Sequence, residues 1–304
     1  MLNSVLATNY LGETIEMPLG IPQASGMAIT KIDGIDAGAA TVNISEVSTN
    51  DGALYSSARI GKRTITLYIT FWPEYDAETC RHLTYKYFPL KQPITLYFVA
   101  DERVCMIDGY VESNSVDIFS SRESTKITVV CPYPYFYSAG EGGAHTTVFY
   151  GIDPWFEFPF SNESLTEPLL EFGQIKTSTD EVIRYEGDAE VGMTIHITAV
   201  DPTGEIIVYN ITTSQYMVIS SEKIAQITGE GIIGGDEIII DTVRGHKRIH
   251  LLRDGVYTNI LNALDKGTTW LYLVKGDNVI AYECEGGSSK LHFQVENRVL
   301  FEGV

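Results

Sequence analysis

Alternation of apolar and polar residues with a period of two is the feature that most constrains this chain. In a strand, successive side chains point to opposite faces, so this period predicts half-buried β-strands rather than helices. Alternating or short apolar runs of strand length occupy residues 64–69, 94–99, 127–130, 194–198, 206–209 and 238–240. Turn signals separate such runs at Asp33-Gly34, Asn50-Asp51-Gly52, Asp108-Gly109, Gly234-Gly235 and Asp254-Gly255. The sequence therefore predicts a mainly β protein.

One stretch has the period of a helix. Pro73 and three nearby acidic residues suit a first helical turn, where the backbone dipole favours negative charge. Apolar or small residues then recur in steps of three and four from Ala77 to Tyr87, and Phe88-Pro89 stops the run. We expect a single helix here, packed on a sheet. Residues 258–264 are expected to make at most a short turn.

The chain length of 304 residues predicts two domains, with one large all-β unit as the alternative. Residues 132–136 close a strand with two prolines, and the glycine-rich residues 138–143 are typical of a flexible connector. The apolar segment Trp155–Phe160 is expected to pack between the domains or to begin the second sheet. We therefore predict an N-terminal domain at 1–137, a linker at 138–164 and a C-terminal domain at 165–304.

The charge balance excludes one class of function. The chain carries 21 basic and 40 acidic side chains, a net charge of −19. Residues 1–150 have a net charge of −6 and residues 151–304 one of −13, so both halves are acidic. Such a chain does not hold nucleic acid or anionic lipid by its overall electric field.

The cellular location is predicted from what the sequence lacks. The first basic residue is Lys31, so the start lacks the charged region of a signal peptide, and no apolar run approaches the length of a membrane span. The four cysteines, Cys80, Cys105, Cys131 and Cys284, lie far apart and form no C-x-x-C pair. We expect buried reduced thiols, with a disulfide as the alternative, in a protein made in a cytosol.

Residues 229–234 match the pattern G-x-G-x-x-G. A dinucleotide site needs this pattern between a strand and a helix, so that the helix N-terminus can hold the pyrophosphate. Here two carboxylates and a strand-like run follow the pattern, at 236–241. We therefore predict a hairpin turn and no cofactor site.

The residues His246, Arg248 and His250 alternate, so on a strand they would share one face. Zinc sites with histidines four residues apart are typical of helices, and the neighbouring Arg244 and Lys247 disfavour a cation. We expect a charged edge strand, with contact to an anion or an acidic partner as the alternative.

No catalytic motif is present: neither G-x-S-x-G, H-E-x-x-H, a P-loop nor an EF-hand occurs. Trp270 lies in the apolar run 268–273, where a core position is expected and a platform for stacking sugars is the alternative. We assign no catalytic, cofactor-binding or metal-binding residue, and the interface residues of any assembly stay open.

Several segments, in order, resemble the distal tail proteins of long-tailed (siphovirus-type) bacteriophages. The first half carries this likeness in residues 32–36, 51–55, 57–59, 63–67, 81–91, 103–111, 117–120 and 131–136. The second half resembles the galectin-like domain of that family in residues 186–188, 191–192, 237–242, 254–255, 259, 270–278 and 301–304. The likeness covers almost the whole chain.

The resemblance implies a structural, non-enzymatic protein of the virion, made in the host bacterial cytoplasm. It implies an N-terminal β-sandwich or barrel-like domain with one helix and a C-terminal galectin-like β-sandwich. Six copies would form a ring that joins the tail tube to the tail-tip hub and to receptor-binding or baseplate proteins. DNA would pass through the ring without specific binding, and an acidic chain suits such a channel. We expect carboxylates of the first domain to line it.

Two other functions stay open. A carbohydrate-binding adhesin would use the C-terminal sandwich and its aromatic side chains to hold cell-wall glycan. A glycan hydrolase would need two carboxylates at a fixed separation across a cleft, and sequence spacing in a β protein does not establish such a pair.

Overall fold

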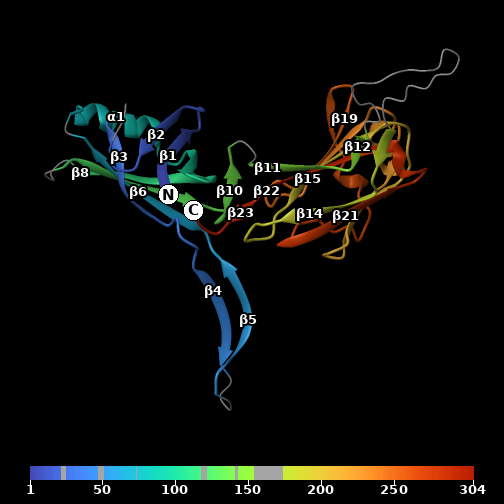
Figure 1. Ribbon diagram of the computed structural model, residues 1–304, viewed down its shortest axis with the longest axis horizontal. Coiled ribbons are helices and arrows are strands. Elements are labelled where there is room, and N and C mark those ends of the chain that lie inside the picture. The colour runs from blue at the N-terminus through green and yellow to red at the C-terminus, as the bar shows by residue number, and fades with distance from the viewer. Residues whose placement is uncertain (22–24, 47–50, 73, 118–121, 141–142, 154–173) are drawn as a thin grey trace, which may run out of the picture. The chain divides into compact units, whose positions relative to one another are not determined.

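The fold was analysed in a computed structural model of the chain. It describes residues 1–21, 25–46, 51–72, 74–117, 122–140, 143–153 and 174–304. The described chain is mainly β, which confirms the predicted fold class. It divides into two compact units. Unit 1 comprises Met1–Gly143 together with Leu300–Val304, and unit 2 comprises Ala144–Val299 (Figure 1).

Unit 1 is built on one large antiparallel sheet. Its strands lie in the order β2 (Thr14–Pro18), β1 (Leu2–Asn9), β7 (Pro93–Ala100), β8 (Val104–Asp117), β9 (Ser124–Cys131), β6 (Arg63–Phe71) and β3 (Met27–Asp33). β10 (Phe136–Ala139) pairs with β8 and with β23 (Leu300–Phe301). A parallel bridge from Leu19 to Ile29 joins the segment after β2 to β3. The two ends of the sheet thus meet, which gives the barrel-like form expected for this half.

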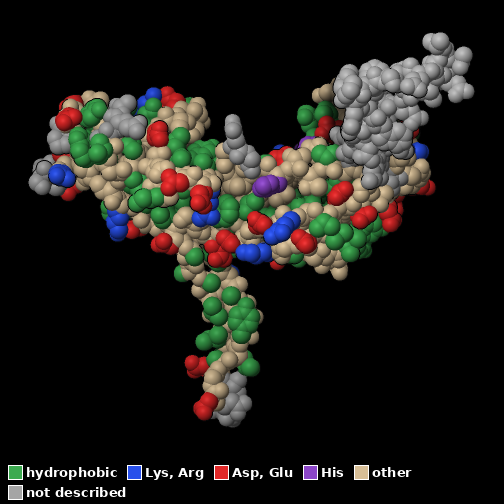
Figure 2. Space-filling model, in the orientation of Figure 1, with side chains coloured by type: hydrophobic (Ala, Val, Ile, Leu, Met, Phe, Trp, Pro, Cys, Tyr) green, Lys and Arg blue, Asp and Glu red, His purple; other side chains and the backbone are tan. Residues whose placement is uncertain are grey.

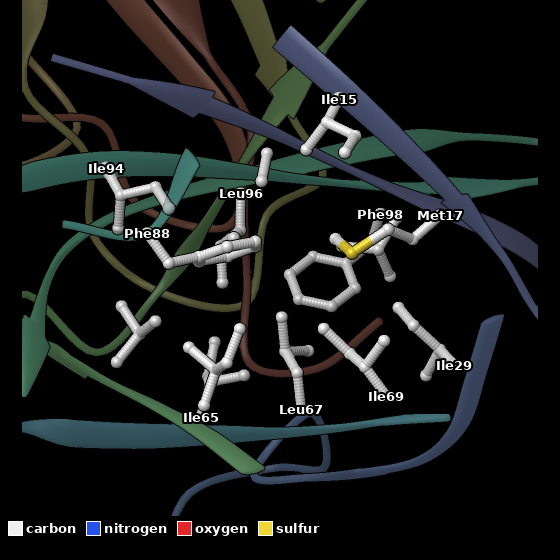
Figure 3. Packing of buried hydrophobic residues seen from close by; sticks show 14 of the residues in the cluster. Ile15, Met17, Ile29, Ile65, Leu67, Ile69, Phe88, Ile94, Leu96 and Phe98 are labelled. Carbon is white, nitrogen blue, oxygen red and sulfur yellow. The ribbon is translucent and has the colours of Figure 1, made fainter. Parts of the chain in front are cut away.

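The core of unit 1 follows directly from the alternation in the sequence. On β6, Ile65, Leu67 and Ile69 point inward and are fully buried. They face Leu96 and Phe98 of β7 in Figure 3. Burying a side chain of this kind contributes roughly 1.5–3 kcal/mol, so this face of the sheet supplies a large part of the stability of unit 1.

The predicted helix is present as α1 (Ala77–Tyr87). Asp76 caps its N-terminus by accepting a hydrogen bond from the backbone N–H of Thr79 at 3.0 Å. Cys80 is buried on the side that faces the sheet, and Phe88, the residue at which the helix ends, is buried as well. Pro73, expected to open this segment, lies outside the described residues.

Unit 2 contains two larger sheets. One has the order β11 (Ala144–Val148), β22 (Leu291–Arg298), β15 (Met193–Ala199), β18 (Glu237–Asp241), β19 (Arg248–Arg253) and β20 (Val256–Asn259). The other has the order β14 (Asp180–Tyr185), β21 (Gly276–Cys284), β16 (Ile206–Asn210) and β17 (Gln215–Ile219). The shorter elements are β12 (Tyr150–Asp153), β13 (Gln174–Thr177), α2 (Ser221–Thr228) and the 3-10 turns η1 (Leu261–Ala263) and η2 (Ser288–Lys290).

Aromatic side chains hold these two sheets of unit 2 face to face. Phe293 of β22 stacks on Tyr282 of β21, with ring centroids 4.7 Å apart. Phe149 meets the edge of both rings, at 4.8 Å from Phe293 and 6.0 Å from Tyr282. Because the rings come from different sheets and all are buried, unit 2 is a β-sandwich, as predicted for this half.

The boundary between the units differs from the predicted one. The predicted linker begins at Ser138, inside β10, although all of β10 belongs to unit 1, and β11, which also lies in the predicted linker, belongs to unit 2. The chain end at 300–304 returns to unit 1, although it was predicted to close the second domain. The pairing of Tyr137 with Leu300 joins positions far apart in the chain, which local composition does not reveal. The predicted segment Trp155–Phe160 lies outside the described residues.

Two local predictions are wrong. Asp108-Gly109 is not a turn, because Gly109 lies inside β8, opposite Ile94. A β-carbon at Gly109 would lie 2.6 Å from Cγ1 of Val129, so glycine is needed there for close packing. The G-x-G-x-x-G segment is not a hairpin either, because it joins helix α2 to strand β18. A dinucleotide site needs the reverse order, so the prediction of no such site at this segment agrees with the fold.

Candidate subunit interface

Strands β4 (Ala40–Glu46) and β5 (Ala53–Ile60) form a sheet of their own, which we call the arm. The arm connects β3 to β6 and extends away from the large sheet of unit 1 (Figure 1). Every residue of β4 is exposed, and so is every residue of β5 except Ile60, which is half-buried. No other described strand pairs with the arm.

The register of the arm separates its side chains into two different faces. Residues paired directly across two antiparallel strands lie on the same face. One face therefore carries the pairs Ala40–Ile60, Val42–Ala58 and Ile44–Tyr55 and, at its far end, Glu46–Ala53. We call it the apolar face after its first three pairs. The other face carries the pairs Thr41–Arg59, Asn43–Ser57 and Ser45–Leu54. The amide of Asn43 donates to the hydroxyl of Ser57 at 2.9 Å, which confirms that this pair shares a face.

The apolar face is exposed to an unusual degree. Val42, Ile44 and Tyr55 are 53 %, 60 % and 68 % exposed. Figure 2 shows hydrophobic side chains along much of the arm. An isolated two-stranded hairpin is marginally stable in water and needs a covering layer on its hydrophobic face. The arm has the pattern of a half-buried sheet without the other half, which is the physical signature of an interaction surface.

The arm also carries few charged side chains. Residues 40–60 hold only Glu46, Asp51 and Arg59 as charged side chains, in a chain with a net charge of −19. Charged residues are depleted in the cores of protein interfaces, where their desolvation would be costly. The near neutrality of the arm therefore lets copies of an acidic protein approach one another there.

A buried guanidinium holds the chain segment that leads into the arm. Arg63, at the start of β6, is 6 % exposed. Its nitrogens donate to the backbone carbonyls of Gly34 and Asp36 before the arm and to those of Pro134 and Glu302 elsewhere, at 2.6–2.7 Å. Burial lowers the pKa of this guanidinium, and nearby negative groups oppose that shift. The contacts are charge-assisted and thus among the stronger kinds of hydrogen bond.

The predicted histidine strand is present but differs in detail. β19 begins at Arg248, so His246 lies before the strand and does not share its face. Arg248 and His250 do lie on one side, with Ile249 buried on the other. β19 pairs with both β18 and β20, so the expected edge strand is in fact an interior strand. Arg248 forms an ion pair with Asp241 at 3.4 Å.

The tryptophan singled out in the sequence does not lie in a strand. Trp270 belongs to an irregular segment between η1 and β21 and is half-buried. The ammonium of Lys247 lies over its ring, 5.2 Å from the centroid. A cation over the ring occupies a face that a sugar would need, so the geometry does not favour the stacking platform.

The cysteines agree with the prediction of reduced thiols. All four are free, and Cys80, Cys105 and Cys131 are buried. Burial raises the pKa of the Cys131 thiol to about 12. Within the described ranges, no group of three or more His, Cys, Asp and Glu side chains is placed to hold a metal ion. The described helices include none that is long and apolar enough to cross a membrane.

Comparison with known proteins gives a likeness in structure only. No protein-family model matches the sequence, and no curated protein matches it. The crystal structure of SPP1 Dit (gp 19.1), described as a paradigm of the hub adsorption apparatus in phages that infect Gram-positive bacteria, matches with a TM-score of 0.65. That match covers 98 % of this chain and 99 % of the other, at 11 % sequence identity. The chain has the fold of a phage Dit protein.

Two further structures support this conclusion. The phage P2 baseplate in its activated conformation with Ca matches with a TM-score of 0.52, and the same baseplate with Sr matches with 0.50. Each covers 98 % of this chain and 99 % of the other, at 11 % identity. The shared fold thus runs through both units rather than through one of them.

Sequence reasoning did not identify the arm, although signals for it were present. The turn Asn50-Asp51-Gly52 was recognised, and Val42 and Ile44 alternate with polar residues before it. What the alternation does not reveal is whether a second layer covers the apolar face. The absence of charge between residues 52 and 58 was the remaining signal.

Proposed function

We propose that this chain is the distal tail protein of a bacteriophage. It forms a hexameric ring that joins the tail tube to the tail-tip hub and to receptor-binding or baseplate proteins. The Dit fold along the full chain supports this proposal. The observation that carries it is the arm, a nearly neutral two-stranded sheet whose apolar face is exposed among the residues that the structure describes.

A ring needs head-to-tail contacts, in which the arm of one copy reaches a different surface on its neighbour; a two-fold contact would instead use the same patch on both copies. Such head-to-tail contacts repeat until the rotation closes, and six copies are the number that the family resemblance implies. The interface would bury Val42, Ile44 and Tyr55, whose transfer from water contributes roughly 25 cal/mol per Å² of apolar area.

The proposal includes further partners and a location. The protein belongs to the virion at the tail tip and is made in the host bacterial cytoplasm. The C-terminal sandwich is galectin-like in fold and carries peripheral parts, and the protein performs no catalysis. Carboxylates of unit 1 line the channel so that DNA slides without being gripped. An electrostatic map of the assembled ring with a basic channel would contradict that last point.

The experiment compares two neighbouring positions on β4. Ile44→Asp places a charge on the apolar face, and Ser45→Asp places the same charge one residue further on, on the opposite face. Sedimentation equilibrium then measures the assembly of each variant and of the unmodified chain. We expect Ile44→Asp to weaken self-association at least 100-fold, because a carboxylate would be buried unpaired. Ser45→Asp should stay within about threefold of the unmodified chain.

The comparison has two outcomes that would count against the role of the arm. Equal assembly by both variants would show that the apolar face is not buried between copies. If both variants lose assembly equally, a charge anywhere on the arm disrupts assembly, and the loss does not depend on burial of the apolar face. Circular dichroism of each variant checks that unit 1 and unit 2 remain folded.

A carbohydrate-binding adhesin is the second candidate, and one observation favours it. Tyr257 of β20 is 64 % exposed, and its ring lies edge-on to His250, at 6.4 Å between centroids. An exposed ring beside planar polar side chains is the arrangement that sugars use for stacking and hydrogen bonding. Binding of the full chain to host cell-wall polysaccharide, lost in Tyr257→Ala, would support this function over assembly alone.

A further inference from the structure

The last residues of the chain, Leu300–Val304, lie on unit 1 and form what we call the strap. Leu300 and Phe301 pair with Tyr137 and Phe136 of β10. Beyond this pairing, the backbone N–H of Val304 donates to the carbonyl of Ile35 at 3.1 Å. The side chains of Phe301 and Val304 pack against the core of unit 1. The chain end is thus built into the fold.

The strap touches unit 1 at the root of the arm, which we define as residues 34–38 before β4 and 61–63 after β5. Ile35, the acceptor for Val304, belongs to this root. A β-carbon on Gly303 would lie 3.2 Å from the carbonyl oxygen of Ile35 and 3.3 Å from the backbone nitrogen of Ala37. Backbone meets backbone here, so the strap and the first half of the root are in close contact.

Arg63 connects the strap to both halves of the root. It lies in the second half itself and donates from Nη1 to the carbonyls of Gly34 and Asp36 in the first half. From Nη2 it donates to Glu302 of the strap at 2.7 Å, and from Nε to Pro134 at 2.6 Å. The guanidinium also lies over the ring of Phe136, 4.7 Å from its centroid.

The strap supplies a hydrogen-bond acceptor that the buried guanidinium of Arg63 needs. A buried cation is costly unless its donors are satisfied, and the carbonyl of Glu302 satisfies one of them. Removing the strap would leave that Nη2 donor without this acceptor inside the protein. The planar fork of arginine also fixes the directions in which its acceptors lie, which a lysine ammonium does not do.

We propose that the strap fixes the direction of the arm and that Arg63 is the positioning residue through which it acts. The arm is exposed along its length, so its orientation is set at the root. Arg63 holds the second half of the root to Gly34 and Asp36 in the first half. The strap packs against this contact. When the strap is released, the strand pairs nearest the root (40–42 with 58–60) open more often, whereas the pairs further out (44–46 with 53–55) stay formed.

Two variants test the proposal, one ending the chain at Phe301 and the other Arg63→Met. Arg103→Met is the matched control. Arg103 also contacts the strap, with its guanidinium 4.7 Å from the centroid of Phe301 and Nη2 at 3.4 Å from the carbonyl of Gly303. None of its contacts with the strap involves Gly34, Ile35 or Asp36. Each change is made in the Ile44→Asp chain, which keeps intersubunit contacts of the arm from masking the effect.

The measurement is amide hydrogen exchange in peptides that cover 40–42 and 58–60, with peptides covering 44–46 and 53–55 as the internal reference. We expect both variants to raise exchange at the base of the arm at least about tenfold, since local opening controls exchange there. Arg103→Met should change it less than about twofold, and the reference should stay constant in all chains.

Three results would overturn the proposal. These are unchanged exchange in both variants, an equal rise in Arg103→Met, and a rise in Arg63→Met without one in the truncated chain. If Arg63→Met does not fold, Arg63→Lys and the truncated chain decide the question in the same way. The exchange measurement does not depend on ring formation, so it can fail or succeed independently of the proposed function.

Discussion

Asp236 is a buried carboxylate of unit 2, 1 % exposed. Arg253 donates to both of its oxygens, at 2.7 and 2.6 Å. Arg253→Met would leave the carboxylate buried and unpaired, so we expect a loss of about 3 kcal/mol in the free energy of unfolding. Urea denaturation measures this loss.

The control for that prediction is a pair that is exposed on both sides. Arg184 and Glu186 are 76 % and 73 % exposed and lie 3.0 Å apart. Arg184→Met should cost less than about 1 kcal/mol, because water screens the interaction. A loss of equal size in the two variants would show that Asp236 does not depend on its partner.

The buried thiol of Cys131 predicts that the stability of the fold depends on pH. Burial raises the pKa of its thiol to about 12, whereas an unfolded thiol ionises near 8.5. The folded state therefore holds its proton over a range in which the unfolded state releases it. The contribution to stability is complete below about pH 8.5 and is lost as the pH rises toward 12.

Melting temperatures of the unmodified chain and of Cys131→Ala, measured from pH 8 to pH 11, check this prediction. The melting temperature of the unmodified chain should fall faster with pH than that of Cys131→Ala. The difference in melting temperature between the two chains therefore narrows as the pH rises. Parallel curves would show that the thiol does not titrate differently in the folded and unfolded chains. Other buried groups, such as Tyr282, are common to both chains and cancel.

Single residues show where sequence reasoning reaches its limit. The cysteines were predicted to be free and buried; all four are free in the structure, and Cys284 is only half-buried. Arg63 could not be singled out, because an arginine at the start of a strand is usually exposed. Its role depends on Glu302, which is 239 positions away in the chain.

At the scale of elements, Gly109 gives a prediction for strand β8. A β-carbon there would lie 2.6 Å from Cγ1 of Val129 and 2.9 Å from Sγ of Cys131, both on β9. Gly109→Ala should therefore destabilise unit 1 by about 1–3 kcal/mol through overpacking. Thermal unfolding measures the loss. An unchanged melting temperature would show that β8 and β9 separate at little cost.

Elements defined by local signals were predictable. The alternation at 64–69 and 94–99 predicted β6 and β7, and the helical period predicted α1. Helix α2 was not predicted, although Ser220 caps its N-terminus and Gly229 ends it in a left-handed conformation. Eight residues are too few for a helical period to stand out from an apolar run.

At the scale of the whole molecule, the β fold and two units were predictable, whereas their boundary was not. The chain enters unit 2 at Ala144 and returns to unit 1 at Leu300. That return depends on the pairing of β23 with β10, which no local pattern announces. The arm was not predicted either: the sequence shows a turn signal at residues 50–52, and only the fold shows that no other described strand pairs with β4 and β5.

The central claim is that the chain assembles into a closed ring of six. Light scattering coupled to size exclusion, at two protein concentrations, tests it most directly on the unmodified chain. A subunit of 33.7 kDa predicts a particle of about 200 kDa whose mass does not change with concentration, because closure leaves no free contact. A monomer at both concentrations, or a mass that keeps growing with concentration, would contradict it.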